Sequence, residues 1–133
     1  MATEERFATD PFGTRAWPEE IRLKKAERLL HIRFEDGAEF ALPAEYLRVE
    51  SPSAEVQGHG PGQKQTVPGK RQVGIRAVEP VGNYAVRIVF DDGHDTGIFS
   101  WSYLYELGAK QAEKWAAYLD ALEKKGLSRD PRF

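Results

Sequence analysis

The sequence contains no cysteine among its 133 residues. Disulfides, thiolate zinc sites, iron–sulfur ligation and cysteine nucleophiles are therefore excluded from this chain. It also lacks an apolar run of the roughly 18 residues that a membrane-spanning helix needs. The first residues, Met1 to Arg6, do not form a basic segment followed by an apolar one, so we expect no secretory signal. These features predict a cytoplasmic protein.

The sequence has little excess of charge of either sign. It holds 19 basic and 21 acidic residues, for a net charge of -2. This balance gives no bulk electrostatic reason to bind nucleic acid or an anionic membrane, and we expect neither as a partner. A hydrophobic content of 41% with 30% charged residues at this length is typical of one compact domain.

The composition divides the chain into three parts. We expect a flexible N-terminal arm over residues 1–16, a domain over residues 17–126 and a C-terminal tail over residues 127–133. Aromatic side chains in such an arm usually dock on the protein's own surface, although a partner contact is the alternative. The aromatic residues concerned are Phe7, Phe12 and Trp17.

Alternating apolar and polar residues predict β-hairpins within the domain. On one strand Leu30, Ile32 and Phe34 form the buried side, while His31 lies on the outward, solvated side. Residues 30–37 align with residues 86–93, and each segment ends in Asp-Gly and leads to a strand, a helical turn and a Tyr-Leu pair. This similarity indicates a duplicated unit, although hairpins with Asp-Gly turns can also resemble each other by convergence.

Two helices are expected after the second hairpin. Ser100 is a suitable N-cap for a helix over residues 101–107 that Gly108 ends. A second helix over residues 109–125 has an apolar face that predicts docking on the sheet, and Gly126 closes it. This face is formed by Ala112, Trp115, Ala116, Leu119 and Leu122. The fold class is therefore α+β: a mainly antiparallel sheet from two related β-hairpin units, packed by a C-terminal amphipathic helix.

The candidate binding residues lie in and near one long loop. Residues 51–72 are rich in glycine and proline, and structureless loops of this length tend to be functional or disordered. The loop carries Glu55 and His59, and the second Asp-Gly turn is followed by His94 and Asp95. If the two units bring these segments together, the four residues form a shared polar cleft that binds a ligand or partner. The alternative is a disordered surface loop.

No motif indicates catalysis or a bound metal. The three histidines, His31, His59 and His94, do not have the spacing of a metal site, and the serines lack the sequence context of a hydrolase nucleophile. The run Gly58-His59-Gly60-Pro61-Gly62 lacks the lysine of a phosphate loop. We therefore expect no enzymatic activity and no cofactor.

Three sequence motifs, spread over the domain, resemble the gamma-butyrobetaine hydroxylase-like N-terminal domain family. Such domains occur alone in small bacterial proteins of unknown function, before the catalytic domain of gamma-butyrobetaine and trimethyllysine dioxygenases, and fused to some iron–sulfur carrier proteins. The motifs are Trp17-Pro18-x-x-Ile21, Leu47-Arg48-x-x-Ser51-Pro52-Ser53-Ala54-Glu55-Val56-x-Gly58-His59-Gly60 and Phe90-Asp91-Asp92-Gly93-His94-x-x-Gly97-Ile98-Phe99-Ser100-Trp101-x-x-Leu104.

The resemblance implies a zinc module in the dioxygenases, with three cysteines and one histidine as ligands. In this sequence the cysteine positions correspond to Ser51, Ser53 and Val56, and the histidine corresponds to His94. Two hydroxyls and a valine cannot replace three thiolates, so we expect no metal here.

Two hypotheses for the function follow. The first is a non-catalytic binding or adaptor domain that contacts a protein partner, which the fusions suggest belongs to iron–sulfur or redox metabolism. The alternative is a metal- or small-ligand-binding protein that uses His59 and His94.

Overall fold

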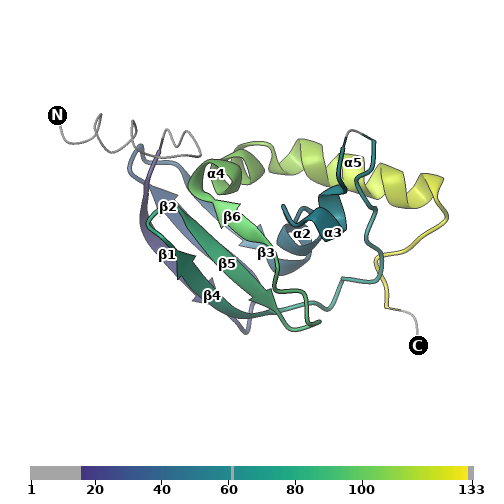
Figure 1. Cartoon of the computed structure of the whole chain (residues 1–133), viewed down its shortest axis with the longest axis horizontal. Helices are drawn as coiled ribbons and strands as arrows, with labels where there is room; N and C mark the ends of the chain where they lie inside the picture. The colour runs from purple at the N-terminus through teal and green to yellow at the C-terminus, as the bar shows by residue number, and fades with distance from the viewer. Residues whose placement is uncertain (1–15, 61, 132–133) are drawn as a thin grey trace.

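The structure, a computed structural model, describes residues 16–60 and 62–131. The strands gather at one end, and α5 extends from them toward the end that holds the C-terminus (Figure 1). No helix in the described ranges has the length and apolar character needed to cross a bilayer. The elements are β1 (Pro18–Lys24), β2 (Leu29–Phe34), β3 (Glu39–Pro43), α2 (Ala44–Val49), α3 (Ala54–Gln57), β4 (Ile75–Val81), β5 (Ala85–Phe90), β6 (Ile98–Ser100), α4 (Trp101–Ala109) and α5 (Gln111–Lys124).

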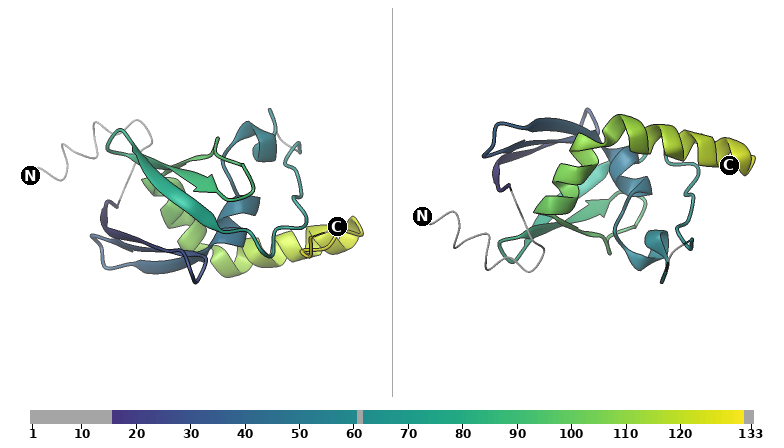
Figure 2. Two further views of the ribbon diagram at one scale, coloured as in Figure 1. Left: turned by 90° about the horizontal axis from the view of Figure 1, so that it is seen from below. Right: turned by 90° about the horizontal axis from the view of Figure 1, so that it is seen from above.

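The α+β class is confirmed, but the strands form two sheets. A further strand precedes each hairpin and pairs with it, which gives antiparallel sheets of order β1-β2-β3 and β4-β5-β6. Figure 2 shows them as separate layers, with α4 packed against β3 and β6. One hydrophobic core unites both sheets, and it includes Leu30, Ile32, Phe34, Val86, Ile88 and Phe90.

The two sheets have the same hydrogen-bonding pattern, which supports duplication. The register shifts between Pro18 and Glu20 in β1 and at the equivalent place in β4. In each Asp-Gly turn the glycine has a φ of 92°. The aspartate of each turn accepts the N–H of the residue two positions later, Ala38 at 2.9 Å and His94 at 3.0 Å. Convergent hairpins would not be expected to share a bulge position as well as a turn.

Two tyrosines join the units through reciprocal hydrogen bonds. The Tyr46 hydroxyl, in α2, donates to the Leu107 carbonyl at 2.7 Å. The equivalent Tyr103 hydroxyl, in α4, donates to the Glu50 carbonyl at 2.6 Å. Each Tyr-Leu pair thus holds the helix of the other unit, which explains why the motif occurs twice.

Replacing either tyrosine by phenylalanine should lower the free energy of unfolding by about 1–2 kcal/mol, because a carbonyl away from water loses its partner. The losses should be similar for Tyr46→Phe and Tyr103→Phe. Tyr105→Phe is the control, since its hydroxyl bonds the exposed Asp36 carboxylate. Urea unfolding measures all three; no loss from either of the first two variants would contradict this role.

The predicted start of α4 is confirmed, but its predicted end is wrong. The Ser100 side chain accepts the Tyr103 N–H at 3.1 Å as the N-cap. Gly108 lies inside the helix, and a Cβ atom there would be 2.3 Å from the Phe40 ring. Glycine at this position allows α4 to approach β3 closely.

Helix α5 ends as predicted, but its buried face differs. Gly126 has a φ of 65°, and the Leu127 N–H donates to the Leu122 carbonyl at 2.9 Å. The helix packs beside α2 and the long loop, where the Tyr118 hydroxyl donates to the Val67 carbonyl at 2.6 Å. The side facing them bears Trp115, Tyr118 and Leu122, whereas Ala112, Ala116 and Leu119 are exposed.

Other expectations need adjustment or lie outside the described ranges. Residues 51–72 include the helical turn α3, whose N-cap Ser53 accepts the Glu55 N–H. The His31 side chain is 17% exposed, less than expected, because it lies beside Glu39 with 2.9 Å between Nε2 and Oε1. Trp17 is buried in the core. Phe7 and Phe12, with the rest of the arm up to residue 15, are not among the described residues.

Candidate functional site

A polar cluster joins the segment after α2 to the turn before β6. We call Ser51, Ser53, Glu55, His94 and Thr96 the His94 clasp. Ser51 and Ser53 follow α2 of the first unit, and His94 and Thr96 follow the Asp-Gly turn of the second. In the repeat, His94 occupies the position of Ala38, so the imidazole is a feature of the second unit alone.

The clasp is a chain of hydrogen bonds and polar contacts. His94 Nε2 lies 2.9 Å from Ser51 Oγ, and His94 Nδ1 lies 3.3 Å from Glu55 Oε2. Thr96 Oγ1 donates to Glu55 Oε1 at 3.0 Å and lies 2.9 Å from Ser53 Oγ. Both ring nitrogens of His94 are therefore engaged, and the clasp connects the two units.

The central groups of the clasp are inaccessible. Ser51 is 0% exposed and the His94 side chain is 2% exposed, whereas the Glu55 side chain is 63% exposed. The predicted cleft residue His94 is therefore enclosed by its neighbours and does not face solvent. Gly97 closes over the serine, since a Cβ atom there would be 2.4 Å from Ser51 Oγ.

Asp92 anchors the turn that carries His94. Its carboxylate accepts hydrogen bonds from Arg48 at 2.8 Å and contacts Lys70 Nζ at 2.7 Å. Burial alone would raise the pKa of Asp92, but hydrogen bonds from Lys70, the His94 N–H and Arg48 outweigh burial and lower that pKa to about 2. The turn is thus held by charge as well as by backbone bonds.

Burial lowers the pKa of His94 below its usual 6.5, and nearby Arg48 lowers it further, against the opposing carboxylates of Glu55 and Asp92. The ring is therefore neutral at neutral pH. When the ring carries its proton on Nδ1, toward Glu55, Nε2 accepts a hydrogen bond from the Ser51 hydroxyl.

Stability should decrease on acidification in two windows. Below pH 6.5 the unfolded chain binds a proton at His94 before the folded chain does, so the free energy of unfolding falls until the lowered pKa is passed. Asp92 adds a second loss as the pH falls from its ordinary pKa of 3.8 to about 2. Urea unfolding between about pH 7.5 and 5 tests the first window. His94→Gln should reduce the slope there, and an unchanged slope would contradict this assignment.

The clasp has the order of groups found in a Ser-His-Glu hydrolase site, which the sequence motifs did not indicate. A nucleophile must reach its substrate, however, and the Ser51 hydroxyl is fully buried. The geometry serves to connect the units rather than to attack a substrate.

The structure brings Ser51 and His94 into contact, two of the four positions at which the resemblance implied zinc ligands, but it supplies unsuitable donors. Ser51 and His94 are in contact, while the Val56 side chain is buried and has no donor atom. Within residues 16–60 and 62–131, no three His, Asp or Glu side chains form a group that could hold a metal ion. The residues present therefore do not fit zinc.

Of the four predicted site residues, Glu55 and His94 meet and the other two lie apart from them. His59 is exposed, and its N–H donates to Gln63 Oε1 at 3.0 Å. The Asp95 carboxylate contacts Arg87 at 3.4 Å. Sequence reasoning missed Thr96 and Lys70, which no motif marks, and gave no role to Arg48, which lies in the second motif. Extending the alignment of the repeats by one residue would have shown that His94 replaces Ala38.

Comparison with known proteins supports one family. A family model described as gamma-butyrobetaine hydroxylase-like, N-terminal, matches residues 21–105. A search of curated proteins found no match.

Solved structures agree with this match. Two NMR solution structures are 49% and 46% identical, each with a TM-score of 0.77; the alignments cover 89% and 94% of this chain and 93% of each other chain. A crystal structure of a protein of unknown function of the DUF971 family, from Acidithiobacillus ferrooxidans, is 43% identical with a TM-score of 0.59. That alignment covers 69% of this chain and 92% of the other.

Proposed function

Because the chain belongs to the gamma-butyrobetaine hydroxylase-like N-terminal family, we propose that it is a non-catalytic binding module that contacts a partner protein in the cytoplasm. The observation that carries this proposal is the burial of Ser51 and His94, which withdraws the reactive groups of the clasp from solvent. Contact with a partner must then be made by the solvent-exposed residues around the clasp.

The proposed contact face lies over the clasp. Glu55, Asp95 and Thr96 are exposed there, and Ile98, which begins β6 two residues after Thr96, is 45% exposed. An exposed apolar side chain with polar neighbours is suited to protein contact. His59, exposed in the loop, extends this face in our proposal. The fusions implied by the family resemblance support a partner from iron–sulfur or redox metabolism.

The chain offers a matched pair of variants for testing this face. Ile98 and Leu119 are the large apolar side chains exposed in the described residues, at 45% and 39%. Tagged full-length protein should capture a partner from an extract of its own cells. Ile98→Asp should abolish that capture, whereas Leu119→Asp should leave it unchanged. Loss with Leu119→Asp alone would place the contact on α5.

The same experiment separates the alternative function. A metal- or small-ligand-binding protein would need a free His94 nitrogen, but both contact clasp residues. We therefore expect elemental analysis to find the same metal content in the captured wild-type protein and in His59→Ala. A metal lost in that variant, without a protein partner, would favour the alternative.

A further inference from the structure

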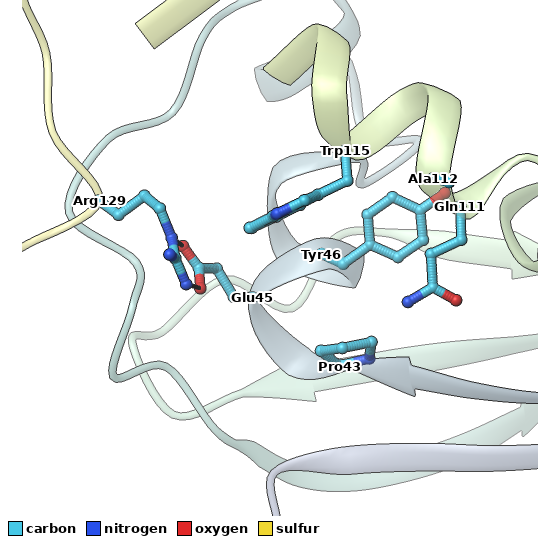
Figure 3. Close-up of a pocket in the computed structure, with 7 residues that line it drawn as sticks. All are labelled: Pro43, Glu45, Tyr46, Gln111, Ala112, Trp115 and Arg129. Atoms are coloured by element: carbon cyan, nitrogen blue, oxygen red, sulfur yellow. Dashed lines mark hydrogen bonds and ion pairs between the residues drawn. The ribbon is translucent and has the colours of Figure 1, made fainter. Parts of the chain in front are cut away.

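A groove lies between the start of α2 and one side of α5, on elements that do not contribute to the clasp. It has a volume of about 600 Å³. Figure 3 shows Glu45 and Arg129 at one end and Gln111 at the other, with Tyr46 and Trp115 between them. Pro43 also lines the groove.

One end of the groove is built to hold a guanidinium group. Arg129 Nε and Nη2 donate to the two oxygens of Glu45 at 2.8 and 2.7 Å. The guanidinium carbon also lies 5.1 Å from the centre of the Trp115 ring. The Glu45 side chain is only 9% exposed. A shielded carboxylate and an indole face together favour arginine over lysine. The planar guanidinium can donate two hydrogen bonds to the carboxylate and stack on the indole at the same time.

The segment that supplies Arg129 is held against the long loop by two main-chain hydrogen bonds. The Gly69 N–H donates to the Ser128 carbonyl at 2.9 Å, and the Arg71 N–H donates to the Arg129 carbonyl at 3.0 Å. The backbone of the segment is thus fixed while its arginine side chain enters the groove. The chain's own tail therefore already places an arginine in the groove, through contacts within one molecule.

We propose that this groove is a binding site for a segment of a partner protein that carries an arginine, and that the chain's own tail occupies the arginine end in cis. The groove continues past Arg129 toward Pro43 and Gln111. That part accepts an apolar side chain next to the arginine. A partner needs this extra contact because the tail competes at high effective concentration.

This site goes beyond the proposed function, since it shares no residue with the face around Ile98. Failure of one therefore leaves the other intact.

Full-length Arg129→Ala tests the site by removing the guanidinium in cis. The probe is N-acetyl-arginine amide, and the measurement is the NMR shift of the Trp115 indole N–H. We expect saturable binding at least about tenfold tighter than to the wild type, and weaker binding of N-acetyl-lysine amide. Arg71→Ala is the matched control, because it removes the exposed Arg71–Asp130 pair of the same tail but leaves Arg129; it should resemble the wild type.

Two further variants make the result decisive. Adding Glu45→Gln to Arg129→Ala should abolish binding of the arginine probe. Arg129→Lys keeps a cation at Trp115 to support the fold, and the arginine probe should still displace it. The proposal would be overturned if the arginine probe bound neither Arg129→Ala nor Arg129→Lys, both folded. It would also be overturned if the probe bound the double variant with Glu45→Gln as tightly as it binds Arg129→Ala alone.

Discussion

Replacing Ser51, Ser53 and Val56 together with cysteine should create a zinc site and raise the free energy of unfolding by about 4 kcal/mol at a free zinc concentration about 1,000 times the dissociation constant. The structure already brings the first of these positions to His94, with 2.9 Å between Ser51 Oγ and His94 Nε2. Zinc bonds of about 2.3 Å to sulfur and 2.0 Å to nitrogen require only a small opening of this contact. The duplicated fold would supply the framework.

The control for this triple variant is the same chain with His94→Ala. It keeps the three thiolates but loses the ligand from the second unit, so zinc should no longer join the units and the gain in stability should be much smaller. Urea unfolding with and without zinc measures the difference. A folded triple variant that binds no zinc would show that the family's ligand positions do not converge here.

Trp115→Ala should cost about 3 kcal/mol, at the low end for large-to-small core changes. The indole is only partly buried, but it contacts Tyr46 from α2 with 6.2 Å between ring centres, Tyr118 at 5.2 Å and the Arg129 guanidinium. Its loss therefore weakens the packing of α5 against both α2 and the tail.

Leu119→Ala, about one helical turn further along the same helix, is the comparison. Because Leu119 is exposed, its truncation should change stability by no more than about 0.5 kcal/mol. Thermal or urea unfolding of both variants decides between the faces. Equal losses would mean that α5 packs through the face that the sequence pattern indicated.

The strands and turns were predictable because their signals are local. Alternation in β2 and β5 and the two Asp-Gly pairs mark hairpins wherever they occur. The buried face of α5 was harder to predict. Alanine counts as apolar in a sequence pattern, but burying its small side chain contributes little to stability. Ala112 and Ala116 fitted the helical stripe, yet the larger ring of Tyr118 is buried because its hydroxyl reaches the Val67 carbonyl. That partner lies 51 residues away, and no local pattern reveals it.

The candidate site was predictable in part for the same reason. The repeat suggested that the loop after the first unit lies near the His94 turn, and the family resemblance assigned Ser51 and His94 to one ligand set. The two residues are in contact. The burial of His94 depends on Gly97 closing over Ser51, which is a tertiary contact. The Arg129 site depends on a tail that lies 84 residues from Glu45, and a tail rich in charge resembles a solvated end in sequence alone.

We infer that the His94 clasp connects the two units by hydrogen bonds, and we expect it to hold no zinc. Elemental analysis of the purified full-length protein, after exposure to zinc and removal of loosely bound ions, tests this directly. We expect far less than one zinc per chain, because a valine and two hydroxyls stand where three thiolates would be needed. About one tightly held zinc per chain, lost in His94→Ala, would contradict it.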